Sequence, residues 1–288
     1  MPRSHAPRPL RSRFGLRSLP SLTAVVVAAV MGIASLGTTP SSAWADDTQS
    51  FSGAPSDGTH SDPARTRFTY VGDPGKVIDD AYYVENSGTV EQTINIYAAD
   101  GYNNGDDGAF ALYSADNAGD YTASWITFDG QKRLSVTLPA QSSKVISMKV
   151  SIPLNAKPGD HIGGVVASVT SAGGNVQIER RVATKIYIRV NGNLQPALTI
   201  SGASASYEPS LNPFDGKVNV SFTIKNTGNV SLGASTVASV TGLFGFPLSG
   251  SVYTTTPELL PDGSRVISMT VPGVWQWIWM NTNVRSEE

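Results

Sequence analysis

The sequence predicts an all-β protein built from two tandem immunoglobulin-like β-sandwich domains. From Arg67 onward, apolar and polar residues alternate with a period of two, as in strands with one buried and one solvent-exposed face. Glycine and proline interrupt these runs at short intervals, and no segment has the spacing of an amphipathic helix. Strand patterns, Asn-x-Gly turns and Leu-Pro turns occur in the same order twice along the chain, which indicates two copies of one domain type.

The strand pattern is clearest in the run VEQTINIYA at residues 90–98. Its apolar side chains alternate with Glu, Thr and Asn, so one face of the strand should be buried. Similar alternation marks residues 134–138 and 144–152. A longer run covers 176–190, where one face carries Ile178, Val182, Ile186, Ile188 and Val190.

The repeated phrases are LPAQSSKVISMKV at 138–150 and LPDGSRVISMTV at 260–271. An Asn-x-Gly tripeptide precedes each of them, and Asn86-Ser87-Gly88 and Asn226-Thr227-Gly228 predict tight turns with positive φ. Chance recurrence of a short strand phrase is the alternative. The paired turns favour duplication, because the order of the turn and strand motifs is repeated as well as their amino-acid sequences.

The expected domain organisation begins with a secretory signal peptide at 1–45. This segment has five arginines and no acid, then the apolar run 22–36, then an Ala-x-Ala cleavage site ending at Ala45. Residues 46–66 are rich in Ser, Asp, Gly, Pro and Thr, which predicts a disordered spacer. The first domain is expected at 67–192 and the second at 197–288, since Gly192 and Pro196 break the strand pattern between them.

Charge and cysteine content narrow the classes of function. With the five leader arginines removed, 16 basic residues face 23 acidic ones, and no basic cluster suggests nucleic acid binding. An exported chain with no cysteine needs a hydrophobic core large enough to stabilise the fold without disulfide bonds. This chain is long enough to form such a core. The sequence suggests no metal, no cofactor and no membrane span in the mature chain.

The spacing of the repeats differs between the two copies. Asn86 and Leu138 are 52 residues apart, whereas Asn226 and Leu260 are 34 apart, so the first domain carries an insertion within 97–130. Loops of this kind often carry binding sites, and this one is rich in aromatic, Asn and Asp side chains that suit a sugar polymer. The candidate ligand-binding residues are Tyr102, Asn103, Asn104, Asp106, Phe110 and Trp125.

The alternatives for this insertion are structural or catalytic. Phe110 and Trp125 could form a small core of the insertion, and Asp100, Asn103, Asn104, Asp106 and Asp107 could form an irregular calcium site or a polar turn. No nucleophile motif is present, so no catalytic residue is proposed and the protein is expected not to be an enzyme. The residues expected to shape turns and close backbone contacts are Asn86, Gly88, Pro158, Gly159, Asp160, His161, Gly163, Gly164, Asn226 and Gly228.

Several distinctive motifs follow one another within residues 67–190: the Asn-containing turn at 86–88, the phrase AADGYNNGDDGAFAL, Trp125, the Leu-Pro turn at 138–139 and the phrase PGDHIGGVVAS. In these motifs and their order, this part of the chain resembles the peptidoglycan-binding domain of the WxL-interacting protein family. The resemblance implies an exported protein of the Gram-positive cell wall, with a first domain that associates with peptidoglycan and a second immunoglobulin-like domain. Members of the family are thought to hold WxL-type proteins at the wall.

The expected function is therefore a non-enzymatic cell-surface protein that associates with peptidoglycan and holds partner surface proteins. A protein-interaction scaffold without direct wall binding is the alternative, and an envelope glycan hydrolase is the third possibility. The chain departs from the family at WQWIWMNTNVRSEE, 275–288, where further strands and an apolar span are expected. A truncated or frameshifted reading frame and a secreted form held only by wall contact both remain open.

Overall fold

The computed structural model describes residues 48–105, 107–173, 176–276 and 280–287. These residues belong to one compact unit of the chain. The predicted signal peptide at 1–45 lies outside the described residues. The helices in the described ranges are three short 3-10 turns, η1 (Ala115–Asn117), η2 (Thr122–Trp125) and η3 (Leu243–Gly245). None of the described helices has the length and apolar character that crossing a membrane requires.

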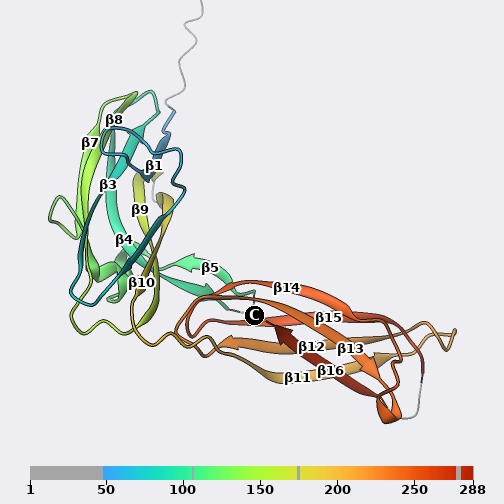
Figure 1. Ribbon diagram of the computed structural model, residues 1–288. Helices are drawn as coiled ribbons and strands as arrows, with labels where there is room; N and C mark the ends of the chain where they lie inside the picture. The colour runs from blue at the N-terminus through green and yellow to red at the C-terminus, as the bar shows by residue number, and fades with distance from the viewer. Residues whose placement is uncertain (1–47, 106, 174–175, 277–279, 288) are drawn as a thin grey trace, which may run out of the picture. The chain divides into compact units, whose positions relative to one another are not determined.

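The first β-sandwich consists of two sheets (Figure 1). Its smaller sheet has the order β1-β3-β8-β6, and its larger sheet has the order β2-β10-β9-β4-β5, with β7 paired to β4. All pairs are antiparallel except β10 with β2. The strands are β1 (Phe51–Pro55), β2 (Phe68–Gly72), β3 (Val77–Asn86), β4 (Gln92–Asn104), β5 (Ala109–Leu112), β6 (Ile126–Phe128), β7 (Arg133–Leu138), β8 (Ser142–Ser151), β9 (Gly159–Gly173) and β10 (Val176–Val190).

The second β-sandwich has two three-stranded sheets, with the orders β11-β12-β15 and β14-β13-β16. Phe222 and Ile224 lie at the centre of its core, which is separate from the core of the first sandwich. The all-β class with two immunoglobulin-like sandwiches is thus confirmed. The strands are β11 (Leu198–Glu208), β12 (Gly216–Asn226), β13 (Leu232–Thr241), β14 (Val252–Leu259), β15 (Ser264–Val274) and β16 (Asn281–Glu287).

The period-two pattern places most side chains as expected. Ile94 and Ile96 of β4 are fully buried between the two sheets of the first sandwich. In β10, however, Ile186 is buried whereas Ile178 and Val182 are exposed, so the predicted common face is buried only in part. Ile178 and Val182 lie in the part of β10 that, among the described strands, pairs with β9 alone, because β2 pairs only with Ile186–Val190.

The prediction of a disordered spacer at 46–66 is wrong for the described part of that segment. Residues Phe51–Pro55 form β1, which pairs along the free edge of β3. Phe51 packs against the core, and Gly53 lies so close to Tyr82 that a Cβ there would overlap the tyrosine ring. Composition missed this strand because backbone hydrogen bonds to an existing sheet edge need few apolar side chains.

The two Asn-x-Gly turns have the same hydrogen-bonding role in both sandwiches. Asn86 is fully buried, and its Nδ2 donates to the carbonyls of Val90, Leu138 and Pro139 at 2.8–2.9 Å. Asn226 is buried likewise, and its Nδ2 donates to Val230 O and Leu259 O. Each asparagine therefore joins its own turn to the Leu-Pro turn that follows in sequence. The duplication seen in the sequence is a duplication of this bonding pattern.

The predicted positive φ at these turns is wrong, because neither Gly88 nor Gly228 has a left-handed backbone. Both glycines are required for a different reason. A Cβ on Gly88 would lie 2.3 Å from Thr48 O, and one on Gly228 would lie 2.2 Å from Gln195 O. The glycines thus allow a neighbouring segment to approach the turn closely.

Phe244, inside η3, has φ 60° and ψ 17°, a left-handed conformation that a bulky residue rarely adopts, and its side chain is 89% exposed. We expect Phe244→Asn to raise the free energy of unfolding of the second sandwich by about 0.5–1 kcal/mol, since asparagine tolerates this conformation better. Urea denaturation measures the change. Phe246→Asn is the matched control, because Phe246 is also exposed but has φ −61°; an equal gain in both variants would contradict the backbone explanation.

Candidate functional site

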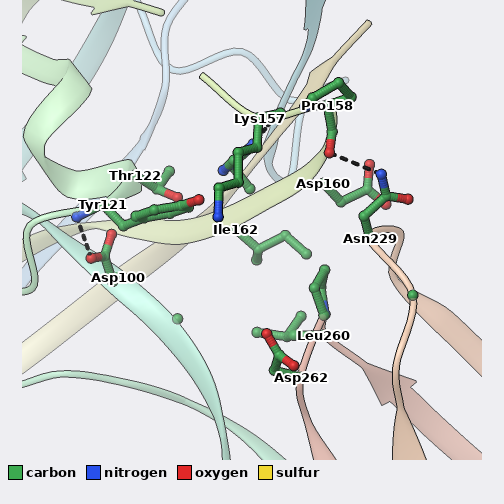
Figure 2. A pocket seen from close by; sticks show the side chains of 14 residues that line it. Asp100, Tyr121, Thr122, Lys157, Pro158, Asp160, Ile162, Asn229, Leu260 and Asp262 are labelled. Carbon is green, nitrogen blue, oxygen red and sulfur yellow. Dashed lines mark hydrogen bonds between the residues drawn. The ribbon is translucent and has the colours of Figure 1, made fainter. Parts of the chain in front are cut away.

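A pocket of about 290 Å³ opens where β4, η2 and the start of β9 meet two loops of the second sandwich (Figure 2). Asp100 and Tyr121 lie on one side of it, and Asn229 lies on the other. We call it the Tyr121 pocket, and the residues that define it are Asp100, Tyr121, Lys157, His161, Asn229 and Asp262.

The Tyr121 ring is held at the mouth of the pocket by two buried aromatic side chains. Its centroid lies 5.2 Å from that of His161 in a stacked arrangement and 6.2 Å from that of Trp125. His161 and Trp125 are each only 6% exposed, whereas Tyr121 is 52% exposed. The two buried rings therefore form a rigid support that presents one aromatic surface to solvent.

His161 is neutral at pH 7. Burial lowers its pKa, and this effect outweighs the opposing influence of the Lys157 carbonyl and of nearby Asp160 and Asp100. Its Nε2 lies 2.8 Å from Lys157 O, so Nε2 carries the hydrogen and Nδ1 is the free acceptor. Within the described residues Nδ1 has no hydrogen-bond partner.

Asp100 fixes the segment that carries Tyr121. Its carboxylate accepts hydrogen bonds from Tyr121 N at 2.9 Å and Ala123 N at 2.6 Å. Burial raises the pKa of Asp100, while these two backbone donors act in the opposite direction. Gly119, with φ 90°, allows the turn to pass directly against the carboxylate. Asp100 thus has a structural role in shaping the pocket wall.

The phrase PGDHIG provides a second wall and connects it to the second sandwich. Asp160 forms a bidentate ion pair with Arg189, at 2.6 and 2.8 Å, and also accepts a hydrogen bond from Ser231 N. Asn229 Nδ2 donates to Pro158 O at 3.0 Å, and Asp160 N donates to Asn229 O at 2.7 Å. These contacts fix the loop at residues 228–231 against the start of β9.

Two oppositely charged side chains remain available at the pocket. Lys157 and Asp262 are both exposed, and within the described residues neither side chain forms a hydrogen bond or an ion pair. Asp262 is held in a left-handed conformation, φ 64°, by the turn that repeats the Leu-Pro motif. The pocket therefore combines one exposed ring with one free ammonium and one free carboxylate.

The residues that the sequence nominated for binding lie mainly outside this pocket. Tyr102 stacks on Tyr113 with centroids 4.6 Å apart, and Asn104 ends β4 in an exposed position. Phe110 is half-buried under the Lys185 ammonium, which lies 4.2 Å from the ring centroid. Trp125 supports Tyr121 from inside, as the alternative of a core role had suggested. Asp106 lies outside the described residues.

Asn103 has a connecting role. Its Nδ2 donates to Gly108 O and Glu258 O, and its Oδ1 accepts a hydrogen bond from Leu260 N at 2.8 Å. The insertion therefore forms a β4-β5 hairpin that contacts the second sandwich, where an open loop was expected. Asn103 is thus used in a structural contact and is not free to bind calcium together with Asp100. Among the described side chains no cluster of three or more His, Asp or Glu residues could hold a metal ion.

Most of the residues nominated as structural have that role. Gly163 and Gly164 permit close approach, since a Cβ there would lie 2.5 Å from Ala99 O and 2.4 Å from Leu112 Cδ1, respectively. Gly159 has φ 125°. Pro158, Asp160, His161 and Gly228 also line the Tyr121 pocket, a position that sequence spacing did not reveal.

The pocket residues Lys157, Asn229 and Asp262 were not predicted from the sequence. They come from three loops that are distant along the chain and meet only in the folded protein. The one available signal was their position, because Lys157 precedes the Pro-Gly turn and Asn229 and Asp262 follow the repeated Asn-x-Gly and Leu-Pro motifs.

A glycan hydrolase would need two carboxylates that face one groove, and the neighbouring acids Asp79 and Asp80 instead contact different partners. Asp80 is bound by Arg65 and Tyr70, while its neighbour Asp79 faces Lys149 at 3.5 Å. Asp107 accepts a hydrogen bond from Ala109 N in the β4-β5 turn. These described carboxylates do not share a groove as an acid and base pair would.

Comparison with known proteins finds no matching family model and no matching curated protein. Solved structures give distant matches. A chaperone–tip adhesin complex of CFA/I fimbriae biogenesis is 14% identical with a TM-score of 0.41, covering 82% of this chain and 98% of that one. The class 5 fimbriae chaperone CfaA is 14% identical with a TM-score of 0.40, covering 82% and 99%. The CsuC–CsuE complex of Acinetobacter baumannii is 9% identical with a TM-score of 0.38, covering 82% and 97%.

Proposed function

We propose that the protein is a non-enzymatic binding protein of the bacterial cell surface that associates with peptidoglycan through the Tyr121 pocket. The observation that carries the proposal is the exposed Tyr121 ring, supported by His161 and Trp125 and flanked by the free charges of Lys157 and Asp262. A sugar ring can place its C–H face on the tyrosine. The stem peptides of peptidoglycan carry carboxylates and amines that match the two charges.

The sequence supports the same proposal from a second direction. The pocket lies partly on the phrase PGDHIGG, which is among the motifs that resemble the peptidoglycan-binding domain of WxL-interacting proteins. The basic and apolar leader at 1–45 favours export, so we propose a location in the wall or on the extracellular surface of a Gram-positive bacterium.

We expect Tyr121→Ala to weaken binding to peptidoglycan about tenfold, the effect of losing about 1.4 kcal/mol of ring contact. The measurement is co-sedimentation of the mature chain with purified peptidoglycan that has been stripped of protein and teichoic acid. The matched control is Tyr253→Ala, because Tyr253 is also exposed but lies on β14 of the second sandwich. Equal pelleting of wild type and both variants would refute the role of the pocket.

A protein-interaction scaffold is the second candidate, and one observation favours it. Three loops at one end of the second sandwich expose large apolar side chains, and the loop at 242–251 has no charged residue. Phe214 and Trp275 pack together with ring centroids 5.4 Å apart, and exposed apolar surface of this kind often marks a protein contact. A chain that binds an isolated WxL-type surface protein but not purified wall would support this candidate. The exposed residues are Leu211, Phe214, Leu243, Phe244, Phe246 and Trp275.

A further inference from the structure

A second cavity, of about 490 Å³, lies on the outer face of the larger sheet of the first sandwich. Strands β4, β7, β9 and β10 form its floor, and residues 114–116, which include most of η1, form its edge. We call it the Tyr97 groove. Its polar floor is formed by Asn95, Tyr97, Arg133, Ser135, Ser168 and Glu179.

The strand register explains how these side chains come together. Ile94 and Ile96 point into the core, so Asn95 and Tyr97 point to the opposite face of β4. Asn95 is level with Ser135 of β7 on one side and Ser168 of β9 on the other, and Tyr97 is level with Arg133. The groove is therefore a row of amide and hydroxyl side chains with one phenol among them.

The hydroxyl of Tyr97 lacks an acceptor in this groove. The side chain is only 3% exposed, and no described residue accepts a hydrogen bond from its Oη. Burial raises the pKa of Tyr97 while nearby Arg181 acts in the opposite direction, so the phenol keeps its hydrogen at neutral pH. An arginine can only donate, so Arg181 cannot accept that hydrogen. A buried donor without an acceptor costs about 1–3 kcal/mol, which a bound acceptor would recover.

The surroundings of Tyr97 define the chemistry of the missing partner. The Arg133 guanidinium lies 5.4 Å from the centroid of the ring, and Ala99 and Val166 pack with Tyr97, so the ring faces are occupied. Recognition in the groove must therefore use hydrogen bonds at the edge of the ring. The charges of Arg133, Asp116 and Glu179 are mixed in sign, which favours a neutral ligand with both donors and acceptors.

We propose that the Tyr97 groove binds a saccharide unit, with Tyr97 Oη donating a hydrogen bond to an oxygen of the sugar. Hydroxyl and amide groups of a sugar can pair with Asn95, Ser135 and Ser168 along the floor. This site is separate from the Tyr121 pocket in its residues, and it does not depend on wall binding through that pocket. The two sites would let one domain contact two sugar units.

The test is calorimetric titration of the mature chain carrying Tyr121→Ala, so that the Tyr121 pocket is disabled in every sample. Two probes separate the sources of sugar, a trimer of N-acetylglucosamine for wall glycan and maltotriose for a neutral surface polysaccharide. Adding Tyr97→Phe removes only the hydroxyl, and we expect it to weaken binding of the preferred probe at least tenfold. The melting temperature should stay the same or rise, because an unpaired buried group is removed.

Tyr82→Phe is the matched control, because the Tyr82 hydroxyl is also buried but lies in the core between the sheets, away from the groove. It should leave binding unchanged. Failure of both probes to bind, or equal affinity with and without the Tyr97 hydroxyl, overturns the proposal. Because Tyr121→Ala is present throughout, these results are independent of whether the Tyr121 pocket binds peptidoglycan.

Discussion

Replacing Asn86 with alanine should lower the free energy of unfolding of the first sandwich by about 3–5 kcal/mol. The side chain is fully buried, its Nδ2 donates to three carbonyls, and its Oδ1 accepts hydrogen bonds from Gly88 N and Gln92. Alanine leaves these backbone and side-chain groups, which are buried or half-buried, without their Asn86 partner. A loss of this size is a large part of the stability of a single domain.

The equivalent variant Asn226→Ala tests whether the effect belongs to the repeated motif. Asn226 bonds to Val230 O and Leu259 O in the second sandwich, so this variant should destabilise the second sandwich instead. Thermal denaturation followed by limited proteolysis would show which half of the chain opens first. If either variant lost less than about 1 kcal/mol, the bonding role assigned to these asparagines would be wrong.

Arg65→Ala should cost about 2 kcal/mol at neutral pH, because it leaves a mostly buried carboxylate without its cation. Arg65 Nη1 and Nη2 lie 3.0 and 2.5 Å from the two oxygens of Asp80, whose side chain is 13% exposed. Urea denaturation measures the loss. Lys149→Ala is the control, since Lys149 and Asp79 are both largely exposed and their pair should contribute within about 0.5 kcal/mol.

The loss of stability caused by Arg65→Ala should become smaller as the pH falls. Burial acts to raise the pKa of Asp80, but the hydrogen bonds from Arg65 and Tyr70 outweigh it, so its pKa in the folded protein is below 3.8. The stabilisation is therefore complete above about pH 4, the unfolded value, and is lost as the pH falls through the lower folded value. A difference between wild type and variant that grew on acidification would contradict this assignment.

Much of the fold could be predicted from local patterns. The alternation in 90–98 reports the buried face of β4 directly, because side-chain direction in a strand depends only on position. The paired motifs at Asn86 and Asn226 predicted the duplication, although the reason for their glycines is close backbone approach and not positive φ. The insertion was located correctly from the spacing of the repeats.

The site could not be predicted in the same way. Lys157, Asn229 and Asp262 have no pattern of their own, and only tertiary contacts bring them beside Tyr121. Asn103 and Phe110 looked like binding residues because of their type, yet the fold uses one for hydrogen bonds to the second sandwich and covers the other with Lys185. Strand β1 was missed because its pairing depends on the free edge of β3, a feature that composition does not contain.

The central claim, that the Tyr121 pocket binds peptidoglycan, is tested most directly by hydrogen–deuterium exchange of the mature chain with and without soluble disaccharide-peptide fragments of the wall. We expect slower exchange in the peptides that contain 118–125 and 157–162, because both segments line the pocket. Fragment binding that leaves these peptides unchanged and protects only the second sandwich would contradict the claim.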